Sequence, residues 1–168
     1  MSDREQIVEK LNLYALAVDA QCWDLFDRIF TEYCDADYGT TARWATREQF
    51  KSDFGAYHAP FDATQHVMMN HQVNLQGDRA NSLTYGNWRL VRYAAEGDPL
   101  WDGTGWYDDD WVRTHAGWQI ARRVCRVIWF TGNDKVKETI PGVTFPDERT
   151  TLREEWRAGQ LAFLQSIS

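Results

Sequence analysis

The sequence predicts an α+β domain, in which a cone-like, curved antiparallel sheet wraps around N-terminal helices and a C-terminal helix follows. Two observations support this prediction. Apolar residues recur at helical spacing near both ends of the chain, and the long middle part has strand patterns separated by turn residues. The chain of 168 residues is 43% apolar and 26% charged, which fits one compact domain with one core over residues 1–168.

Two helices are predicted at the start of the chain. Apolar residues at helical spacing run over residues 7–18, behind Ser2 or Asp3 as a cap, so the first helix should end near Asp19. The same pattern repeats over a shorter span, 23–30, and predicts a second, short helix.

A strand and two further helices are predicted from similar signals. The segment 33–39 alternates as a strand does, and Thr46 to Gln49 has the spacing of a capping box at the start of a third helix. The tail returns to helical spacing over about 147–166, with Asp147 as its cap, which predicts a C-terminal helix.

Four strand patterns lie between these helices and form two hairpins. Their ranges are 63–76, 80–93, 105–114 and 118–130. Gly77-Asp78 supplies the turn of the first hairpin, and a loop rich in Gly, Asp and Pro over 96–104 separates the two. The space inside such a sheet is a natural pocket for a small molecule.

Composition excludes several classes of partner. The formal charge of -7 would repel phosphate backbones, and Lys and Arg are scattered along the chain, so we expect no nucleic acid partner. No apolar run approaches a membrane span, and the first residues lack a signal-peptide pattern, so we expect a cytoplasmic protein that does not bind membranes. Nine Trp, seven Tyr and eight Phe are enough to line a pocket or a subunit interface as well as a core.

Metal and cofactor chemistry have little support in the sequence. His66 and His71 differ by an odd number, so a regular strand would point them to opposite faces. The run Asp108-Asp109-Asp110 is split between faces in the same way, which favours a solvated strand or edge charge. The chain contains no GxSxG, P-loop or GxGxxG motif. We therefore expect no metal and no cofactor.

Acid-base chemistry by Asp19 and His66 is the remaining hypothesis. Asp19 ends an otherwise apolar stripe, where a carboxylate facing the core needs a partner. A carboxylate bound to one imidazole nitrogen would leave the other nitrogen to take a proton from a substrate. The competing interpretation is a water-facing residue at a helix end and a strand histidine whose hydrogen bonds are satisfied.

A set of motifs in a fixed order resembles the SnoaL-like branch of the nuclear transport factor two and ketosteroid isomerase superfamily. The motifs are Tyr14, Asp19, Trp23-Asp24, Tyr38, Thr64-Gln65-His66, Gly77-Asp78-Arg79-Ala80 and Trp118-Gln119-Ile120-Ala121-Arg122-Arg123. The resemblance covers about 5–130. Within the branch it is similar to scytalone dehydratase, bile acid 7α-dehydratase and hexachlorocyclohexane dehydrochlorinase, which perform eliminations with an Asp-His dyad and no metal.

The resemblance implies roles for individual residues. Asp19 and His66 match the dyad, and His66 lies in the TQH motif. Tyr14 is similar in position to a pocket tyrosine or lysine, and Tyr38 to a tyrosine that positions a water or carbonyl oxygen. Arg123 resembles a pocket arginine that holds developing negative charge. The alternative for Arg123 is a strand arginine paired with one of the aspartates of 108–110.

One departure concerns substrate binding. Scytalone dehydratase has a second pocket histidine on the strand that here reads TYGNWRL, where this chain offers Tyr85, Asn87 or Trp88. The polar group that would polarise the substrate therefore differs, and scytalone itself is not the expected substrate.

The predicted function is a cofactor-independent lyase that removes water or another leaving group from a hydrophobic cyclic or aromatic molecule. The alternatives are an isomerase or polyketide-type cyclase that uses the same base, and a noncatalytic protein that binds a hydrophobic ligand. The resemblance also implies a homodimer or homotrimer built on the outer face of the sheet.

Overall fold

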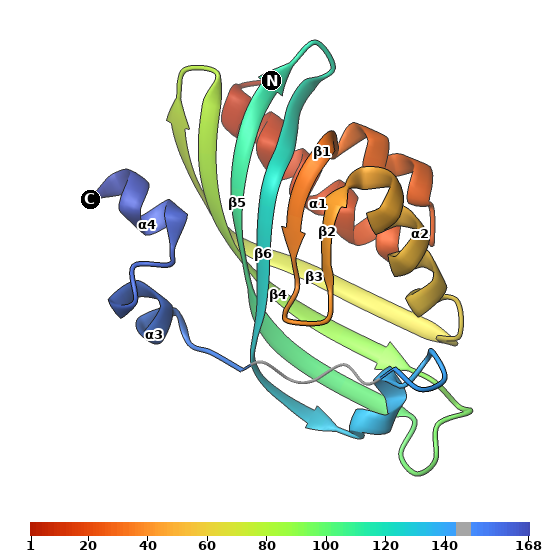
Figure 1. The fold of residues 1–168 in the computed structure, drawn as a ribbon. Coiled ribbons are helices and arrows are strands. Elements are labelled where there is room, and N and C mark those ends of the chain that lie inside the picture. The colour runs from red at the N-terminus through yellow and green to blue at the C-terminus, as the bar shows by residue number, and fades with distance from the viewer. Residues whose placement is uncertain (144–148) are drawn as a thin grey trace.

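One strongly curved sheet dominates the computed structural model, which describes residues 1–143 and 149–168. Its six strands follow the order β2-β1-β6-β5-β4-β3 (Figure 1). The strands are β1 (Phe30–Asp37), β2 (Arg43–Thr46), β3 (Ala63–Gln76), β4 (Arg79–Val91), β5 (Leu100–Thr114) and β6 (Gly117–Gly132). All neighbours are antiparallel except β1 and β6, which are parallel.

The helices lie on both sides of this sheet. They are α1 (Asp3–Asp19), the 3-10 helix η1 (Trp23–Arg28), α2 (Arg47–His58), the 3-10 helix η2 (Asp134–Lys137), α3 (Leu152–Arg157) and α4 (Ala162–Ile167). The sheet wraps around α1 and α2, while α3 and α4 lie on its other side (Figure 1). The predicted α+β fold is therefore confirmed.

The N-terminal helices begin where the capping signals predicted. Ser2 accepts a hydrogen bond from the Glu5 backbone N–H, and Glu5 returns one to Ser2, which completes a capping box. Thr46 accepts from the Gln49 backbone N–H at the start of α2. None of the helices in the described part of the chain is long and apolar enough to cross a membrane.

Three local predictions were wrong. The short strand β2 was missed, and β5 begins at Leu100 inside the segment expected to be a loop. The tail forms two short helices because α3 ends at Arg157, with Ala158 as its C-cap, and Gly159 adopts a positive φ of 70° that interrupts the helix. The proposed cap Asp147 lies outside the described residues.

A bulge in β3 overturns the expected facing of its histidines. The register shifts between Met69 and Gln72, and Asn70 has a φ of 54°. One extra residue in β3 reverses the alternation of its side chains after the bulge. His71 Nδ1 therefore lies 3.2 Å from the hydroxyl of Thr84, which is buried. Thr84 is on the same face of β4 as Trp88, the residue that pairs with His66. His66 and His71 therefore face the same side, contrary to the prediction.

The aspartates of β5 are also placed differently from the prediction. Asp108 and Asp109 are wholly buried, whereas solvated charges were expected. Asp108 accepts hydrogen bonds from the backbone N–H groups of Ala162 and Phe163 and so fixes the start of α4. Asp109 binds Arg123 on β6. The alternation of side chains does separate the two aspartates, because Asp108 points to the outer face of the sheet and Asp109 points to the interior.

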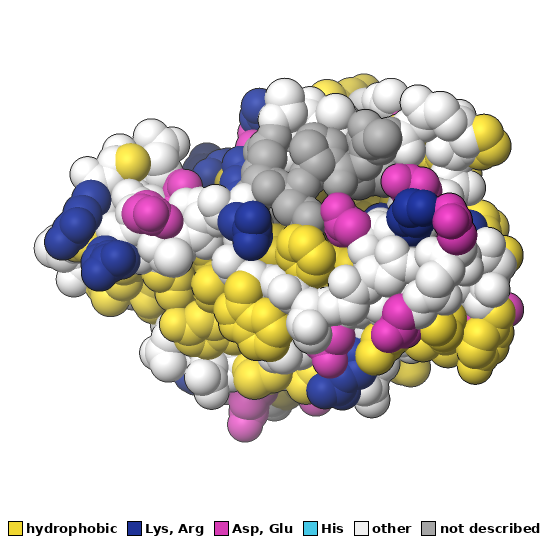
Figure 2. Space-filling view, turned by 90° about the horizontal axis from the view of Figure 1, so that it is seen from below, with side chains coloured by type: hydrophobic (Ala, Val, Ile, Leu, Met, Phe, Trp, Pro, Cys, Tyr) yellow, Lys and Arg dark blue, Asp and Glu magenta, His cyan; other side chains and the backbone are white. Residues whose placement is uncertain are grey.

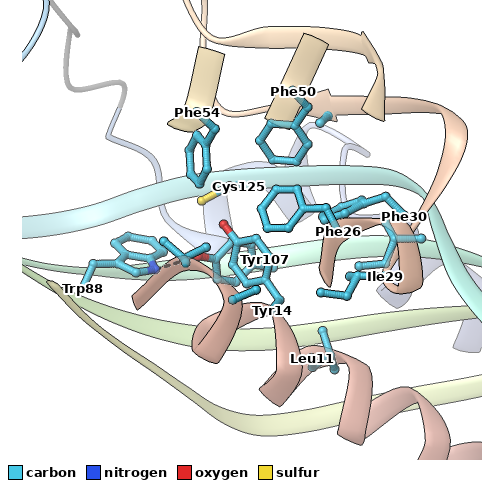
Figure 3. Close-up of a cluster of buried hydrophobic side chains, with 14 of the residues drawn as sticks. Leu11, Tyr14, Phe26, Ile29, Phe30, Phe50, Phe54, Trp88, Tyr107 and Cys125 are labelled. Atoms are coloured by element: carbon cyan, nitrogen blue, oxygen red, sulfur yellow. Dashed lines mark hydrogen bonds between the residues drawn. The ribbon is translucent and has the colours of Figure 1, made fainter. Parts of the chain in front are cut away.

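The core lies between the sheet and the N-terminal helices. Figure 3 shows its aromatic side chains, with Tyr14 from α1 close to Tyr107 from β5. A smaller cluster on the outer face packs Leu161 against Trp106 and Val124. The C-terminal helices thus cover part of the outer face on which an oligomer contact was expected.

Candidate active site

A cavity of about 350 Å³ opens between α2 and the concave side of the sheet, a size typical of small-molecule sites. Aromatic side chains form much of its wall. They are Tyr14, Tyr38, Trp44, Phe54, Tyr57, Trp88, Trp101 and Tyr107. Figure 2 shows the lower surface of the molecule, where hydrophobic side chains lie together among acidic and basic ones. An apolar wall of this kind suits a flat hydrophobic ligand.

Asp19 and His66 are in direct contact at the cavity wall, as predicted. The last residue of α1, Asp19, places its Oδ1 atom 2.7 Å from His66 Nδ1. The His66 backbone N–H donates to Oδ2 at 2.8 Å, and the Thr64 hydroxyl donates to Oδ1 at 2.9 Å. Both ends of the TQH motif therefore bind one carboxylate and hold it rigidly against the imidazole.

The pKa of Asp19 shows that this carboxylate is kept ionised. Burial raises the pKa, but the hydrogen bonds and charge of His66 and the bond from Thr64 outweigh burial, so the pKa lies below its usual value. A carboxylate at a helix C-terminus is also disfavoured by the helix dipole. The contacts from β3 therefore stabilise a charge that its own helix opposes.

The contact with Asp19 decides which nitrogen of His66 carries the proton. An ionised carboxylate can only accept hydrogen bonds, so Nδ1 of a neutral His66 is the donor. Nε2 is then unprotonated and has a free lone pair. Because His66 is among the residues that line the cavity, this nitrogen can act as a base toward a ligand.

Tyr14 and Tyr38 form a second polar feature of the cavity wall. Their hydroxyl oxygens are 2.9 Å apart, so one hydroxyl donates to the other. Tyr107 is nearby, and its hydroxyl accepts a hydrogen bond of 2.6 Å from Trp88 Nε1 (Figure 3). Gly86 leaves room for these rings, because a Cβ there would come within 2.9 Å of Tyr107.

Burial keeps these tyrosines protonated. Desolvation raises the pKa of Tyr14 to about 12, against the opposing effect of the Arg123 charge. Desolvation likewise raises the pKa of Tyr38 and of Tyr107 well above the usual value. At neutral pH these groups are hydrogen-bond donors, and none of them is a base.

Arg123 is placed differently from what the resemblance implied. It is wholly buried and does not line the cavity. Its Nε and Nη2 atoms each donate to Asp109 at 2.8 Å, the strand pairing considered as the alternative. The guanidinium lies over the rings of Tyr14 and Tyr107, at 4.4 and 4.5 Å from their centroids. Arg123 thus contacts the tyrosines from behind and does not reach a ligand directly.

Of the three substrate-binding candidates on β4, only Trp88 lines the cavity. Tyr85 packs on the outer face with the cluster around Trp106 and Leu161. Asn87 is two residues further along and shares that face, where Thr104 approaches its side chain at 3.5 Å. The prediction for Tyr85 and Asn87 was wrong, because residues at odd and even positions of a strand point to opposite faces.

His58 and Arg126 are among the residues of the cavity wall that were not singled out from the sequence. His58 follows Phe50 and Phe54 at steps of four, so the apolar stripe of α2 could have placed it in the interior. Arg126 binds both carboxylate oxygens of Asp37, at 2.9 and 3.0 Å, and gave no comparable signal.

A metal centre is not formed by the side chains that the structure describes. In residues 1–143 and 149–168, no group of three or more His, Cys, Asp or Glu side chains could hold a metal ion. The polar groups of the cavity wall include His66 with its partner Asp19, the protonated tyrosines and a second histidine, and charged side chains such as Arg126 also line it.

Sequence comparison places the chain in a family. Residues 1–124 match the SnoaL-like domain, so the chain belongs to the SnoaL-like family. An uncharacterized protein of Mycobacterium tuberculosis is 34% identical over 128 residues, which cover 74% of this chain and 84% of that protein.

Structural comparison shows the nuclear transport factor 2-like fold. A superfamily protein from Salmonella enterica has a TM-score of 0.68 at 16% identity, covering 77% of this chain and 94% of its own. A candidate scytalone dehydratase from Novosphingobium aromaticivorans has a TM-score of 0.70 at 20% identity, covering 90% and 100%. A hexachlorocyclohexane dehydrochlorinase from Novosphingobium barchaimii has a TM-score of 0.66 at 14% identity, covering 85% and 93%. At these identities the likeness concerns the fold.

Proposed function

We propose that the protein is a cofactor-independent lyase that eliminates water or another leaving group from a hydrophobic cyclic or aromatic molecule. The observation that carries this proposal is the 2.7 Å contact between Asp19 and His66 at the wall of an aromatic cavity. A protein that only binds a ligand needs no ionised carboxylate to orient an imidazole. The names of the two structural neighbours, a dehydratase and a dehydrochlorinase, agree with elimination chemistry.

The elimination begins with removal of a proton from carbon. His66 Nε2 takes the proton, and the electron pair of the C–H bond forms the new carbon-carbon double bond as the bond to the leaving group breaks. Asp19 holds the tautomer of His66 and stabilises the imidazolium that results. The leaving group departs with its electron pair, and the imidazolium later returns its proton to water.

The tyrosines assist the oxygen of the substrate. If each hydroxyl donates to the next, from Tyr107 through Tyr14 to Tyr38, the last O–H is free for a carbonyl or a leaving hydroxyl. A protonated tyrosine can also supply the proton that converts a leaving hydroxide into water, and the tyrosinate then recovers a proton from the imidazolium through water. Arg123 acts through Tyr14 as a positioning residue, since it fixes the ring from behind.

An isomerase or polyketide-type cyclase is the second candidate function. The same base would serve it, because these reactions also begin with removal of a proton from an acidic carbon. The product decides between them, since elimination raises the unsaturation of the molecule and isomerisation does not.

The proposal can be tested with 4-hydroxy-2-tetralone, a cyclic β-hydroxy ketone that becomes 2-naphthol when it loses water. The fluorescence of the product would follow turnover. We expect turnover by the wild-type protein and a loss of about 100- to 10,000-fold in His66→Ala, because general base catalysis supplies rate factors of that size. His115→Ala, in the exposed turn between β5 and β6, is the matched control and should keep full activity. Equal rates in the wild-type protein and His66→Ala would contradict the proposal.

We also propose a homodimer or homotrimer that uses the part of the outer sheet face not covered by the C-terminal helices. Analytical ultracentrifugation would test the oligomer separately from the chemistry. A monomer at micromolar concentration would reject this assembly and leave the assignment of the base unaffected.

A further inference from the structure

His58 occupies a place in the cavity that the mechanism above does not use. It is the last residue of α2, is 2% exposed and lies among aromatic rings. Its ring centroid is 4.2 Å from that of Phe54 and 5.5 Å from that of Trp23. The same ring centroid lies 6.2 Å from that of His66, so the two imidazoles are neighbours in one pocket.

The hydrogen bond of His58 identifies its tautomer. Nδ1 lies 2.7 Å from the backbone carbonyl oxygen of Phe54. A carbonyl oxygen can only accept, so Nδ1 carries the proton and Nε2 carries a lone pair. Because His58 lines the cavity and Nδ1 is bonded to the backbone of its own helix, we assign Nε2 to the contact with a ligand.

The environment of His58 keeps this tautomer neutral. Burial lowers the pKa of His58 to about 3, and the hydrogen bond to Phe54 and the charge of Asp19 offset only part of this effect. A neutral imidazole with Nδ1 already bonded is a hydrogen-bond acceptor and has no proton to give at Nε2. Its surroundings therefore differ from those of His66, whose Nδ1 is bound to the carboxylate of Asp19.

A hydrogen-bond acceptor in an aromatic cavity discriminates between ligands. A ligand with an O–H or N–H group can satisfy Nε2, whereas a ligand of the same shape without a donor leaves it desolvated and unpaired. The short distance between the two imidazoles allows one small ring to reach both. A leaving hydroxyl gains nothing from an acceptor, so the group that binds here is one that the reaction retains.

We propose that His58 is a specificity-determining residue, whose Nε2 accepts a hydrogen bond from a retained hydroxyl group of the substrate. The substrate class is then a hydroxylated ring, such as a phenol or a cyclic enol, and halogenated hydrocarbons without a donor are poor ligands. This inference rests on the proposed function for the role of His66, but it concerns binding and can be tested without turnover.

A first experiment uses the wild-type protein with nitrogen-15 labelled histidine. We expect NMR to show His58 protonated at Nδ1 and not at Nε2. Its Nε2 resonance should shift on titration with 2-naphthol and stay in place with 2-methoxynaphthalene, which has the same rings and no donor. A proton on Nε2, equal shifts with both ligands or no shift with either would overturn the assignment.

A second experiment measures affinity by calorimetry in His58→Phe, which keeps an aromatic ring and removes the acceptor. The wild-type protein should bind 2-naphthol about 2- to 12-fold more tightly than 2-methoxynaphthalene, as expected for one net hydrogen bond. His58→Phe should lose this preference, and His115→Phe should keep it. A preference that persists in His58→Phe would assign the acceptor to another group and overturn the inference.

The two proposals fail in different ways. Loss of the ligand preference in His58→Phe together with unchanged turnover in His66→Ala would leave a binding pocket without the proposed base. Loss of turnover in His66→Ala together with an unchanged preference in His58→Phe would keep the base and reject the role of His58.

Discussion

Two carboxylate pairs contact the ring of Tyr14, and they differ in what they can do. Asp19 binds His66 at the cavity wall, where the side chains are 25% and 5% exposed. Asp109 binds Arg123 through two hydrogen bonds of 2.8 Å, and both side chains are wholly buried. The first pair meets the cavity and the second is closed off from it.

The partner of each carboxylate determines its use. An imidazole has a lone pair that can take up a proton, so the pair of Asp19 and His66 has a group that can act as a base. A guanidinium keeps its charge at any pH at which the protein is folded, so the pair of Asp109 and Arg123 can only fix the positions of neighbouring side chains such as Tyr14. A buried charge pair is therefore a candidate for catalysis only where its partner titrates and a ligand can reach it.

The largest expected contrast comes from breaking each pair in turn. Asp109→Ala should lower the free energy of unfolding by about 3–5 kcal/mol, because Arg123 would be left as an uncompensated buried charge. Asp110→Ala is the matched control on the same strand, since Asp110 is partly exposed, accepts a hydrogen bond of 2.7 Å from Asn81 and lies 3.8 Å from Arg122. Urea denaturation would measure both. Equal losses of unfolding free energy in the two variants would contradict a special contribution of the buried pair to stability.

A milder change to the same pair sharpens the comparison. Arg123→Lys keeps the charge but loses the planar fork that binds both oxygens of Asp109. We expect a loss of about 1.5–3 kcal/mol in unfolding free energy, the value of a hydrogen bond to a charged group. Turnover should fall through a lower kcat with KM unchanged, because Tyr14 loses its support and no ligand contact is removed. A raised KM alone would instead indicate that Arg123 meets the substrate.

The effect that is smallest per unit of pH concerns the pH dependence of stability. Because the pKa of folded His58 is about 3, the unfolded chain binds a proton between about pH 6.5 and pH 3 that the folded protein does not. Wild-type stability should therefore fall with decreasing pH in this window, with a contribution from His58 of up to about 1.4 kcal/mol per pH unit. His58→Phe should lose this contribution. Unfolding curves at several pH values would detect it, and parallel pH profiles for the two proteins would contradict the assigned pKa.

The fold was predicted from local signals, whereas the contact between Asp19 and His66 was predicted from the resemblance that Asp19 and the TQH motif carry. Capping residues and the apolar stripe place Asp19 at the end of α1, and the TQH motif places His66 near the start of β3. The side of the sheet to which later residues of β3 point could not be predicted, because the bulge at Asn70 reverses the alternation of side chains. His71 was assigned to the wrong face for that reason.

The remaining site residues were missed for tertiary reasons. Whether Tyr85 or Trp88 faces the cavity depends on which side of β4 the helices cover, and alternation alone does not decide this. The burial of Asp108 depends on backbone N–H groups of α4 that are 54 residues away along the chain, and no local pattern shows them. The pairing of Arg123 with an aspartate of 108–110 was considered from the sequence, but the burial of that pair was not.

The central claim is that His66, held by Asp19, removes a proton from carbon. The most direct test is hydrogen-deuterium exchange at the acidic C1 position of 2-tetralone in heavy water, followed by proton NMR, since exchange requires a base and no leaving group. We predict that the wild-type protein accelerates exchange and that His66→Ala and Asp19→Asn both lose the acceleration while remaining folded. Exchange at the wild-type rate in His66→Ala would contradict the account.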